Sequence, residues 1–166
     1  MDTKPVQTLN SETLRSAMRA WSAGITVVTA VHGEDHHGMT VNSFASISLN
    51  PAMVSVSLQK HTRTHELVMR SRAFGVTILA ANQQDVSDLF AGRHPEITDR
   101  LAAVKTETVI TGAPFIIGGL AWFDCRITQT YDVGGSTHVL AEVLAAREFD
   151  GEPLIYHNRD YWKLTR

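Results

Sequence analysis

The sequence has little that would tie it to a membrane, to nucleic acid or to an oxidising compartment. No apolar run approaches the roughly 20 residues that cross a bilayer, and the first ten residues, MDTKPVQTLN, lack the apolar core of a secretory signal. The single cysteine, Cys125, excludes an intramolecular disulfide. A net charge of −2 gives no electrostatic basis for binding nucleic acid or an anionic membrane. We therefore predict a cytoplasmic protein with no nucleic-acid or membrane partner.

The glycine fingerprints of the common nucleotide-binding folds are missing too. No GxGxxG follows a predicted strand, and there is no Walker-type loop. With 166 residues, 43% of them hydrophobic and 19% charged, the chain is long enough to bury one core. No linker, repeat or low-complexity tract divides it. We predict a single domain over residues 1–166, with a flexible N-terminal tail over residues 1–10.

Histidines occur in two places where metal binding has to be considered. His61 and His65 are four residues apart, but no glutamate stands between them in the pattern of a metalloprotease. His32, His36 and His37 share a predicted turn without a second cluster of ligand residues to complete a site. We predict no metal site.

Hydrophobic periodicity predicts short alternating strands with few helices. Leu14, Ala17, Met18 and Trp21 lie at the spacing of one helical face, in a helix that Ser11 would cap. Two further helices are predicted to begin at Thr64 and at Asn82, the second with Asp85 three residues on. Strands are predicted over residues 25–31, 53–58, 73–80, 120–131 and 137–149, with turns at 31–38 and 150–153. This pattern favours a mainly β protein with flanking helices and a closed antiparallel sheet.

The segment from Gly38 to Pro51, GMTVNSFASISLNP, is the most informative part of the chain. Alternation of apolar and polar residues over positions 45–49 predicts a half-buried strand that ends at Pro51. Before that strand, Thr40, Asn42 and Ser43 bring hydrogen-bonding side chains and backbone donors together. Such a polar surface suits a flat, polar-edged ring or a phosphate, and an ordinary strand with a serine-rich edge is the alternative.

This segment, with MVSVSL at 53–58 and KHTRTHEL at 60–67, closely resembles the flavin reductase family. These are small reductase components that supply reduced flavin to two-component monooxygenases. The similarity continues through FGVTIL at 74–79, LAWFDC at 120–125 and PLIY at 153–156, so it covers residues 11–164. The first block is fairly specific, and the later ones count through their order and spacing. The resemblance implies an antiparallel split β-barrel of the FMN-binding type, usually a homodimer with flavin at or near the subunit interface.

The resemblance also implies a flavin site made from separate segments of the chain. Its predicted cofactor-binding residues are Thr40, Val41, Asn42, Ser43, Ser57, Leu58, Lys60, Arg63, Thr64 and Phe90. Lys60, Arg63 and Thr64 would meet the phosphate, because two cations before a helix N-terminus attract an anion. Solvated loop charge is the alternative for both cations. Phe90 stands where the family often has an aromatic residue close to the flavin, yet its spacing equally fits core packing.

His138 is the candidate catalytic residue, as a contact of the nicotinamide. Many members of the family carry a Gly-x-His element before a strand that ends in Gly-Glu-Val. Counting back from Glu142 without a gap puts Ser136 in the place of that histidine, and a two-residue shift at Gly134-Gly135 puts His138 there. A strand histidine with no catalytic part is the alternative. Hydride transfer depends chiefly on stacking the two rings at the right distance, so it requires no general acid.

The function that the resemblance implies is an NAD(P)H:flavin oxidoreductase that serves a separate monooxygenase. Its cofactors would be FMN or FAD, with NADH or NADPH as the reductant, and the sequence leaves both choices open. Two alternatives remain: an oxidase or reductase of an organic substrate with tightly bound flavin, and a non-catalytic flavin-binding protein.

Overall fold

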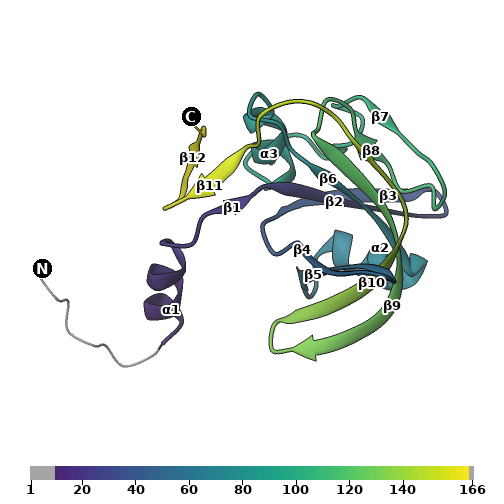
Figure 1. Cartoon of the computed structure of the whole chain (residues 1–166), viewed down its shortest axis with the longest axis horizontal. Helices are drawn as coiled ribbons and strands as arrows, with labels where there is room; N and C mark the ends of the chain where they lie inside the picture. Colours follow the sequence, from purple (N-terminus) through teal and green to yellow (C-terminus); the bar gives the residue numbers. More distant parts are fainter. Residues whose placement is uncertain (1–9, 165–166) are drawn as a thin grey trace, which may run out of the picture.

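The structure is a computed structural model, and it describes residues 10–164. Its main feature is an antiparallel seven-stranded sheet in the order β3-β2-β6-β9-β10-β5-β4, drawn in Figure 1. A small sheet, β1-β11-β12, and the pair β7-β8 lie beside it. The helices are α1 (Ser11–Met18), α2 (Arg63–Ser71) and α3 (Gln84–Phe90). The strands are β1 (Ala23–Gly24), β2 (Thr26–His32), β3 (Asp35–Val41), β4 (Ala45–Leu49), β5 (Ala52–Gln59), β6 (Ala73–Ile78), β7 (Thr106–Glu107), β8 (Phe115–Ile116), β9 (Ala121–Val133), β10 (Ser136–Glu148), β11 (Ile155–His157) and β12 (Asp160–Trp162).

The predicted mainly β class with antiparallel strands is confirmed, but the described strands do not form the predicted closed sheet, because β3 and β4 do not pair with each other. The connection between β3 and β4 explains the split barrel. These two strands are the opposite edges of the seven-stranded sheet, yet they follow each other in the chain. Residues 42–44 join them, and a link that short spans about 10 Å at most. The sheet therefore has to curl until its edges come close, as Figure 1 shows. The segment predicted to bind flavin crosses the opening between the edges.

Two clusters of buried residues fill the curled sheet. The first packs α2, through Leu67 and Val68, against strand residues such as Phe74 and Val139. The second packs α3, through Leu89 and Phe90, against residues that include Val27. Burying apolar side chains of this size is the main stabilising term of such a fold. Both helices therefore hold the strand ends that carry the candidate site.

The predicted helix starts are each wrong by one or two residues, and in α1 and α2 this is because another side chain makes the cap. Asn10, not Ser11, caps α1 with its Oδ1, which accepts from Thr13 N at 2.8 Å. Thr62, not Thr64, is the extended residue whose hydroxyl accepts from His65 N, at 3.3 Å. At α3, Gln83 precedes the helix in place of Asn82 and makes no side-chain cap. The Gln83 amide instead accepts from Ala80 N and donates to Ile117 O.

Two predictions about strands β3 and β4 are also corrected. The turn after β2 is tighter than predicted, so His36, His37 and Gly38 belong to β3. β4 is largely exposed rather than half-buried: Ile47 is 51% exposed and Leu49 is 90% exposed. A register irregularity between Ser46 and Ser48 interrupts the predicted alternation of β4, and no other described part of this chain covers Ile47 or Leu49 well.

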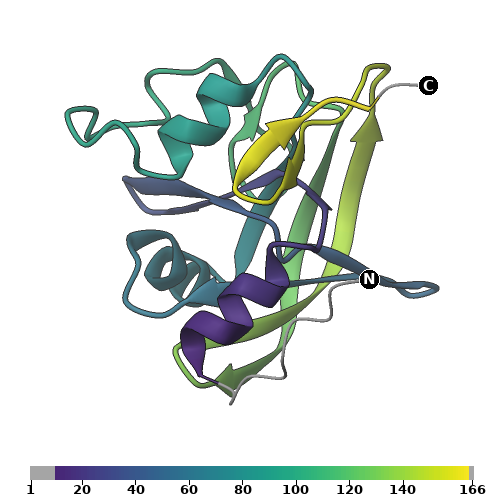
Figure 2. The same cartoon turned by 90° about the vertical axis from the view of Figure 1, so that its left-hand side faces the viewer.

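Helix α1 lies apart from the sheet, as Figure 1 shows, on the side that faces the viewer in Figure 2. Among the described residues it buries no side chain. Leu14 is 53% exposed, Met18 is 55% exposed and Trp21, which follows the end of the helix, is 68% exposed. The predicted flexible tail lies outside the described residues except for Asn10. Within residues 10–164, no helix is long and apolar enough to cross a membrane.

Candidate functional site

A hydrogen-bonded cluster joins three of the predicted site residues across β5, β10 and the link after β3. Ser43 Oγ donates to Ser57 O at 2.9 Å and accepts from Ser57 N at 3.1 Å. Ser57 Oγ lies 2.9 Å from His138 Nδ1, and the two residues are register partners in the sheet. The cluster holds the imidazole through Nδ1, which leaves Nε2 for another partner. All three side chains are partly exposed, so a ligand can reach them.

The register of β10 shows how the positions of Ser136 and His138 are related, and one of these two stands in the place of the family histidine. The strand alternates partly exposed and buried residues from Ser136 onward, so positions 136 and 138 share one face. Ser136 pairs with Gln59, and His138 pairs with Ser57, two residues further from the hairpin tip. A two-residue shift therefore moves the histidine along the strand by about 7 Å without turning it to the other face.

Thr40, Val41 and Asn42 line a cavity of about 140 Å³ at the end of β3. The opposite wall comes from α3 and the segment after it, and from the C-terminal strands, with Arg93, Tyr156 and Tyr161 among the lining residues. Thr40 donates its hydroxyl to Ser87 O at 2.7 Å, which fixes α3 against β3. Asn42 also lines a larger cavity, of about 360 Å³, between α1 and the β11–β12 turn. The predicted flavin segment thus opens toward the α1 side of the molecule.

A second polar cluster ties the C-terminal strand to α3. Tyr161 donates its hydroxyl to Asp88 Oδ1 at 2.6 Å, and its oxygen lies 2.9 Å from the Ser87 hydroxyl, which acts as donor to it. Arg93 pairs with Asp88 at 2.9 Å. Burial and, next, the hydrogen bond to Asp88 raise the pKa of Tyr161, so this phenol is neutral at physiological pH. Tyr161 belongs to the aromatic C-terminal segment that could cover the flavin or close the barrel or dimer, whereas no sequence pattern assigned a role to Ser87, Asp88 or Arg93. They come from separate segments without a motif, so periodicity offered no signal for them.

The predicted phosphate loop divides its two cations between separate places. Lys60 Nζ lies 3.3 Å from Asp132 Oδ1, and Lys60 N donates to Gly135 O at 2.9 Å, so this residue turns toward the β9–β10 hairpin. Arg63 turns toward β3, where its Nη2 lies 3.5 Å from Asp35 Oδ1. The structure does not bring Lys60 and Arg63 together over one anion.

Three predicted site residues have side chains buried in the protein. Leu58 is fully buried in the first core cluster, on the opposite side of β5 from Ser57. Thr64 is fully buried, and its Oγ1 lies 2.8 Å from His37 Nδ1. Phe90 is 1% exposed and packs against β3 where Gly38 leaves it room. These three side chains therefore support the site from the protein interior. Of Leu58 and Thr64, only the backbone is suited to contact a ligand.

Cys125 and His65 take structural positions. Cys125 is fully buried, and burial, followed by the charge of Asp124, raises the pKa of its thiol. Such a thiol is not a nucleophile at neutral pH. His65 Nε2 lies 2.9 Å from Thr137 Oγ1, and burial lowers the pKa of this histidine. Over residues 10–164, no group of three His, Cys, Asp or Glu side chains is placed to hold a metal ion.

Comparison with known proteins identifies the family. A sequence profile described as "Flavin reductase like domain" matches residues 18–165. The chain belongs to the flavin reductase family. Its curved sheet with an opening between β3 and β4 is the fold expected from the resemblance, and solved flavin reductases share it.

Relatives in this family include named flavin reductases. The FMN reductase (NADH) SmoA of Agrobacterium fabrum is 36% identical over 157 residues, which cover 95% of this chain and 88% of the relative. The NADH-dependent flavin reductase StyB of Pseudomonas fluorescens is 39% identical over 138 residues, 82% of this chain and 78% of the relative. The NADH:FAD oxidoreductase SgcE6 of Streptomyces globisporus, solved in complex with NAD and FAD fragments, superposes with a TM-score of 0.87 at 28% identity, covering 96% of this chain and 98% of that one.

The residues present fit a flavin of this family. The opening between β3 and β4 offers a rigid polar edge at Asn42 and Ser43, fixed by the hydrogen bonds of Ser43 to both backbone groups of Ser57. Aromatic rings at Tyr156 and Tyr161 stand across the neighbouring cavity. A flat ring system with hydrogen-bonding edges matches this combination of polar and aromatic walls.

Proposed function

We propose that this single-domain protein is a cytoplasmic NADH:flavin oxidoreductase that passes reduced flavin to a separate monooxygenase. The Ser43–Ser57–His138 cluster at the mouth of the split barrel carries the proposal, because it joins residues from both halves of the predicted site. Relatives support the reductant and the partner. The names of SmoA and StyB specify NADH. HsaB of Mycobacterium tuberculosis, which is 32% identical, is named as the reductase subunit of a flavin-dependent monooxygenase.

When bound, the flavin supplies the ring that accepts a hydride from reduced nicotinamide. Asn42 and the Ser43 backbone would hold the edge of that ring, and the two hydrogen bonds between Ser43 and Ser57 keep this segment rigid. His138, oriented by Ser57 through Nδ1, would use Nε2 to position the nicotinamide. Tyr156 and Tyr161 exclude water from the adjoining cavity. Alignment of the two rings is the main source of rate in such a transfer.

The proposal includes a homodimer formed through α1 and β4. The apolar residues Leu14, Met18, Trp21, Ile47 and Leu49 are all more than half exposed, and exposed apolar groups that gather on one side of a molecule favour association. Asn42 lines the cavity beside α1, so a second copy there would stand next to the flavin segment. A dimer through this side would place each flavin close to the interface.

The test is oxidation of NADH by the purified protein with FMN, FAD or no added flavin, followed by the absorbance of NADH. We expect a rate that rises and saturates with added flavin, and a lower rate with NADPH. Saturation without added flavin, in a protein that purifies with stoichiometric colour, would instead favour a tightly bound flavin. No oxidation with any combination would overturn the reductase.

The His138 contact is tested separately with His138→Ala. We expect the KM for NADH to rise by about tenfold, as for loss of one charged or polar contact, while the Kd for flavin stays within a factor of about two. His94→Ala is the matched control, because His94 is exposed and pairs only with Glu96 among the described ion pairs. Unchanged KM for NADH in His138→Ala would remove this histidine from the nicotinamide side.

A further inference from the structure

A cavity of about 180 Å³ lies between β3, the start of α2 and the segment around residues 98–101. His36, His37, Gly38, Arg63, Asp99 and Arg100 line it. It borders the same edge strand as the cavity at Thr40–Asn42, about 10 Å further back along β3. No sequence motif marked Arg100, which comes from the segment between α3 and β7.

Arg100 lines this cavity, and its guanidinium lacks well-formed hydrogen bonds within residues 10–164. Its Nε is buried and has no hydrogen-bond partner among the described residues. Its Nη1 makes only a long contact with Phe90 O, at 3.4 Å. A buried guanidinium N–H without an acceptor costs free energy that a bound anion would recover. Gly92 leaves room for this side chain, since a Cβ there would lie 3.2 Å from Arg100 Nη2.

The carboxylates near the cavity are already engaged by other groups. Asp99 Oδ1 lies 3.1 Å from His36 Nε2 and accepts from Ala102 N at 3.1 Å. Asp35 is shared between Arg63, at 3.5 Å, and Arg70, at 4.0 Å. Neither carboxylate makes an ion pair with Arg100 within the described residues.

The lowered pKa of His37 indicates a positive electrostatic potential in this cavity. Burial, followed by the charges of Arg100 and Arg63, lowers the pKa of His37 to about 4. The imidazole is therefore neutral at physiological pH. With Nδ1 paired to the Thr64 hydroxyl, a neutral ring that accepts from Thr64 carries its proton on Nε2 and is a hydrogen-bond donor.

We propose that this cavity binds a phosphate monoester through the guanidinium groups of Arg63 and Arg100, with the neutral His37 imidazole as a further donor. The inference rests on the proposed function, which supplies two sources of such a group: the 5′-phosphate of the flavin and the 2′-phosphate of NADPH. Arginine suits the site because its planar fork meets two phosphate oxygens at once. This assigns the phosphate to the β3 side of α2, away from Lys60.

The experiment compares Arg100→Gln with the unmodified protein, using FMN against riboflavin and NADPH against NADH. Riboflavin is FMN without the phosphate, so it isolates the contribution of that group. If the source is the flavin, the Kd and KM for FMN rise by about tenfold or more, and those for riboflavin stay unchanged. If the source is the pyridine nucleotide, the KM for NADPH rises relative to NADH, and both flavins bind as before.

Arg70→Gln is the matched control, because it removes an arginine that also lies by Asp35 but does not line the cavity. We expect none of these ratios to change in Arg70→Gln. Should Arg100→Gln fail to fold, Arg63→Gln replaces it, since the Arg63 side chain is 54% exposed. Equal effects on FMN and riboflavin with an unchanged NADPH preference would overturn the phosphate site. Calorimetric titration with FMN and riboflavin decides this even if the protein oxidises no NADH, so the two proposals fail separately.

Discussion

Helices α1 and α2 have similar local sequence features, but they differ in how they pack against the rest of the molecule. They differ by one residue in length, each begins at a side-chain cap, and each carries an apolar face. α2 buries Thr64, Leu67 and Val68, whereas α1 buries no side chain among the described residues. Figure 1 shows α1 standing clear of the sheet on which α2 packs, and in Figure 2 α1 lies toward the viewer, in front of the strands. An apolar stripe therefore predicts a helix reliably, but it does not say which molecule covers that stripe.

The attachments of the two helices differ in the same way. α2 follows β5 and precedes β6 directly, and it packs across β2 and β3. α1 is held near its C-terminal end, where Arg19 O accepts from Asn158 N at 3.1 Å and Ser22 Oγ lies 2.9 Å from His157 Nδ1. This places α1 as an arm on the surface, which agrees with the proposal that a second copy covers it.

The largest expected difference between the helices comes from truncating one leucine in each. Leu67→Ala should lower the free energy of unfolding by about 3 kcal/mol, because Leu67 is 3% exposed and a cavity would remain. Leu14→Ala should change it by less than about 0.5 kcal/mol at low protein concentration, since Leu14 is 53% exposed. Urea unfolding at several protein concentrations measures both values.

The concentration dependence separates the two explanations of α1. If a second copy covers Leu14, the loss in Leu14→Ala grows as protein concentration rises, while the loss in Leu67→Ala does not. A concentration-independent loss of several kcal/mol in Leu14→Ala would mean that α1 packs within its own chain.

A stronger perturbation of the α1 face tests the dimer itself. Replacing Leu14, Met18 and Trp21 together by Ser removes the exposed apolar surface and leaves the described core untouched. We expect the sedimentation coefficient to fall to that of a monomer, with the far-UV circular dichroism of the sheet retained. The control is a triple replacement on the polar face of α1, in which Glu12, Arg15 and Ser16 are changed to Ala. An unchanged sedimentation coefficient would exclude α1 from the interface.

Sequence patterns predicted the fold well where residues pack within one chain. The strands around β5, β6, β9 and β10 lie close to their predicted positions because their alternation matches a core that the chain itself buries. The same reasoning was wrong for β4, whose apolar side is exposed. Periodicity records that a face is apolar, and that information is identical for a core and for an interface.

The candidate site was predictable only in part, for a related reason. The family motifs drew attention to Ser43, Ser57 and His138, which do lie together. They did not indicate that Thr64 is buried against His37, or that Arg100 reaches the same place. Those relations depend on how β3, α2 and the segment after α3 meet in space, and residues from separate segments leave no spacing to read.

The β3–α2 contact should make stability depend on pH in a way that the α1 region does not. The pKa of His37 is about 4 in the folded protein, below the ordinary value of about 6.5 that the unfolded chain restores. The unfolded state therefore binds a proton between these values that the folded state does not, and stability is lost as pH falls. From about pH 7 to about pH 5 we expect a loss of about 1–2 kcal/mol from this residue, because it is only partly buried.

His37→Gln tests that assignment, because it removes the titrating group and keeps a hydrogen-bonding side chain beside Thr64. Urea unfolding over the same pH range should show a shallower decline for the variant than for the unmodified protein. His32→Gln is the control, since His32 is exposed at the end of β2. Parallel declines in all three proteins would assign the pH dependence to other groups, with His65, whose pKa is also lowered by burial, as the first of them.

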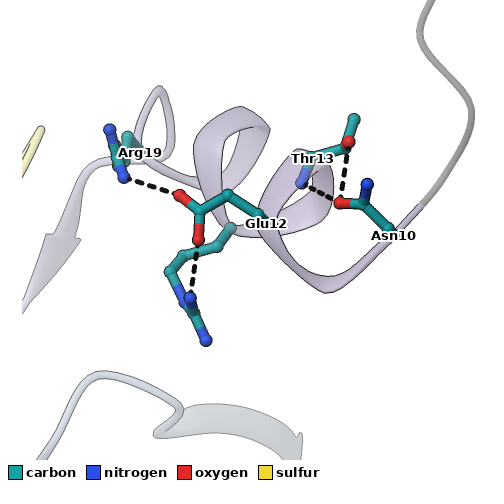
Figure 3. Close-up of polar contacts among 5 residues, drawn as sticks. Asn10, Glu12, Thr13 and Arg19 are labelled. Atoms are coloured by element: carbon teal, nitrogen blue, oxygen red, sulfur yellow. Dashed lines mark hydrogen bonds and ion pairs between the residues drawn. The ribbon is translucent and has the colours of Figure 1, made fainter.

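The smallest expected effects come from removing the N-terminal caps of α1 and α2. Asn10 Oδ1 accepts from both the backbone N–H and the hydroxyl of Thr13, and Glu12 pairs with Arg19, as Figure 3 shows. Thr62→Ala should lower the free energy of global unfolding by about 1 kcal/mol, because α2 is part of the core. Asn10→Ala removes an equivalent cap, but α1 can fray without unfolding the sheet.

Hydrogen exchange distinguishes these two outcomes. In Asn10→Ala, amides of α1 should exchange several times faster while amides of β6 and β9 keep their protection, and in Thr62→Ala the core strands should lose protection together with α2. Such a split would show that two helices with the same local signals belong to different cooperative units. If Asn10→Ala instead lowered the protection of β6 and β9, α1 would be coupled to the core, and the covering of its apolar face would have to be sought within the chain.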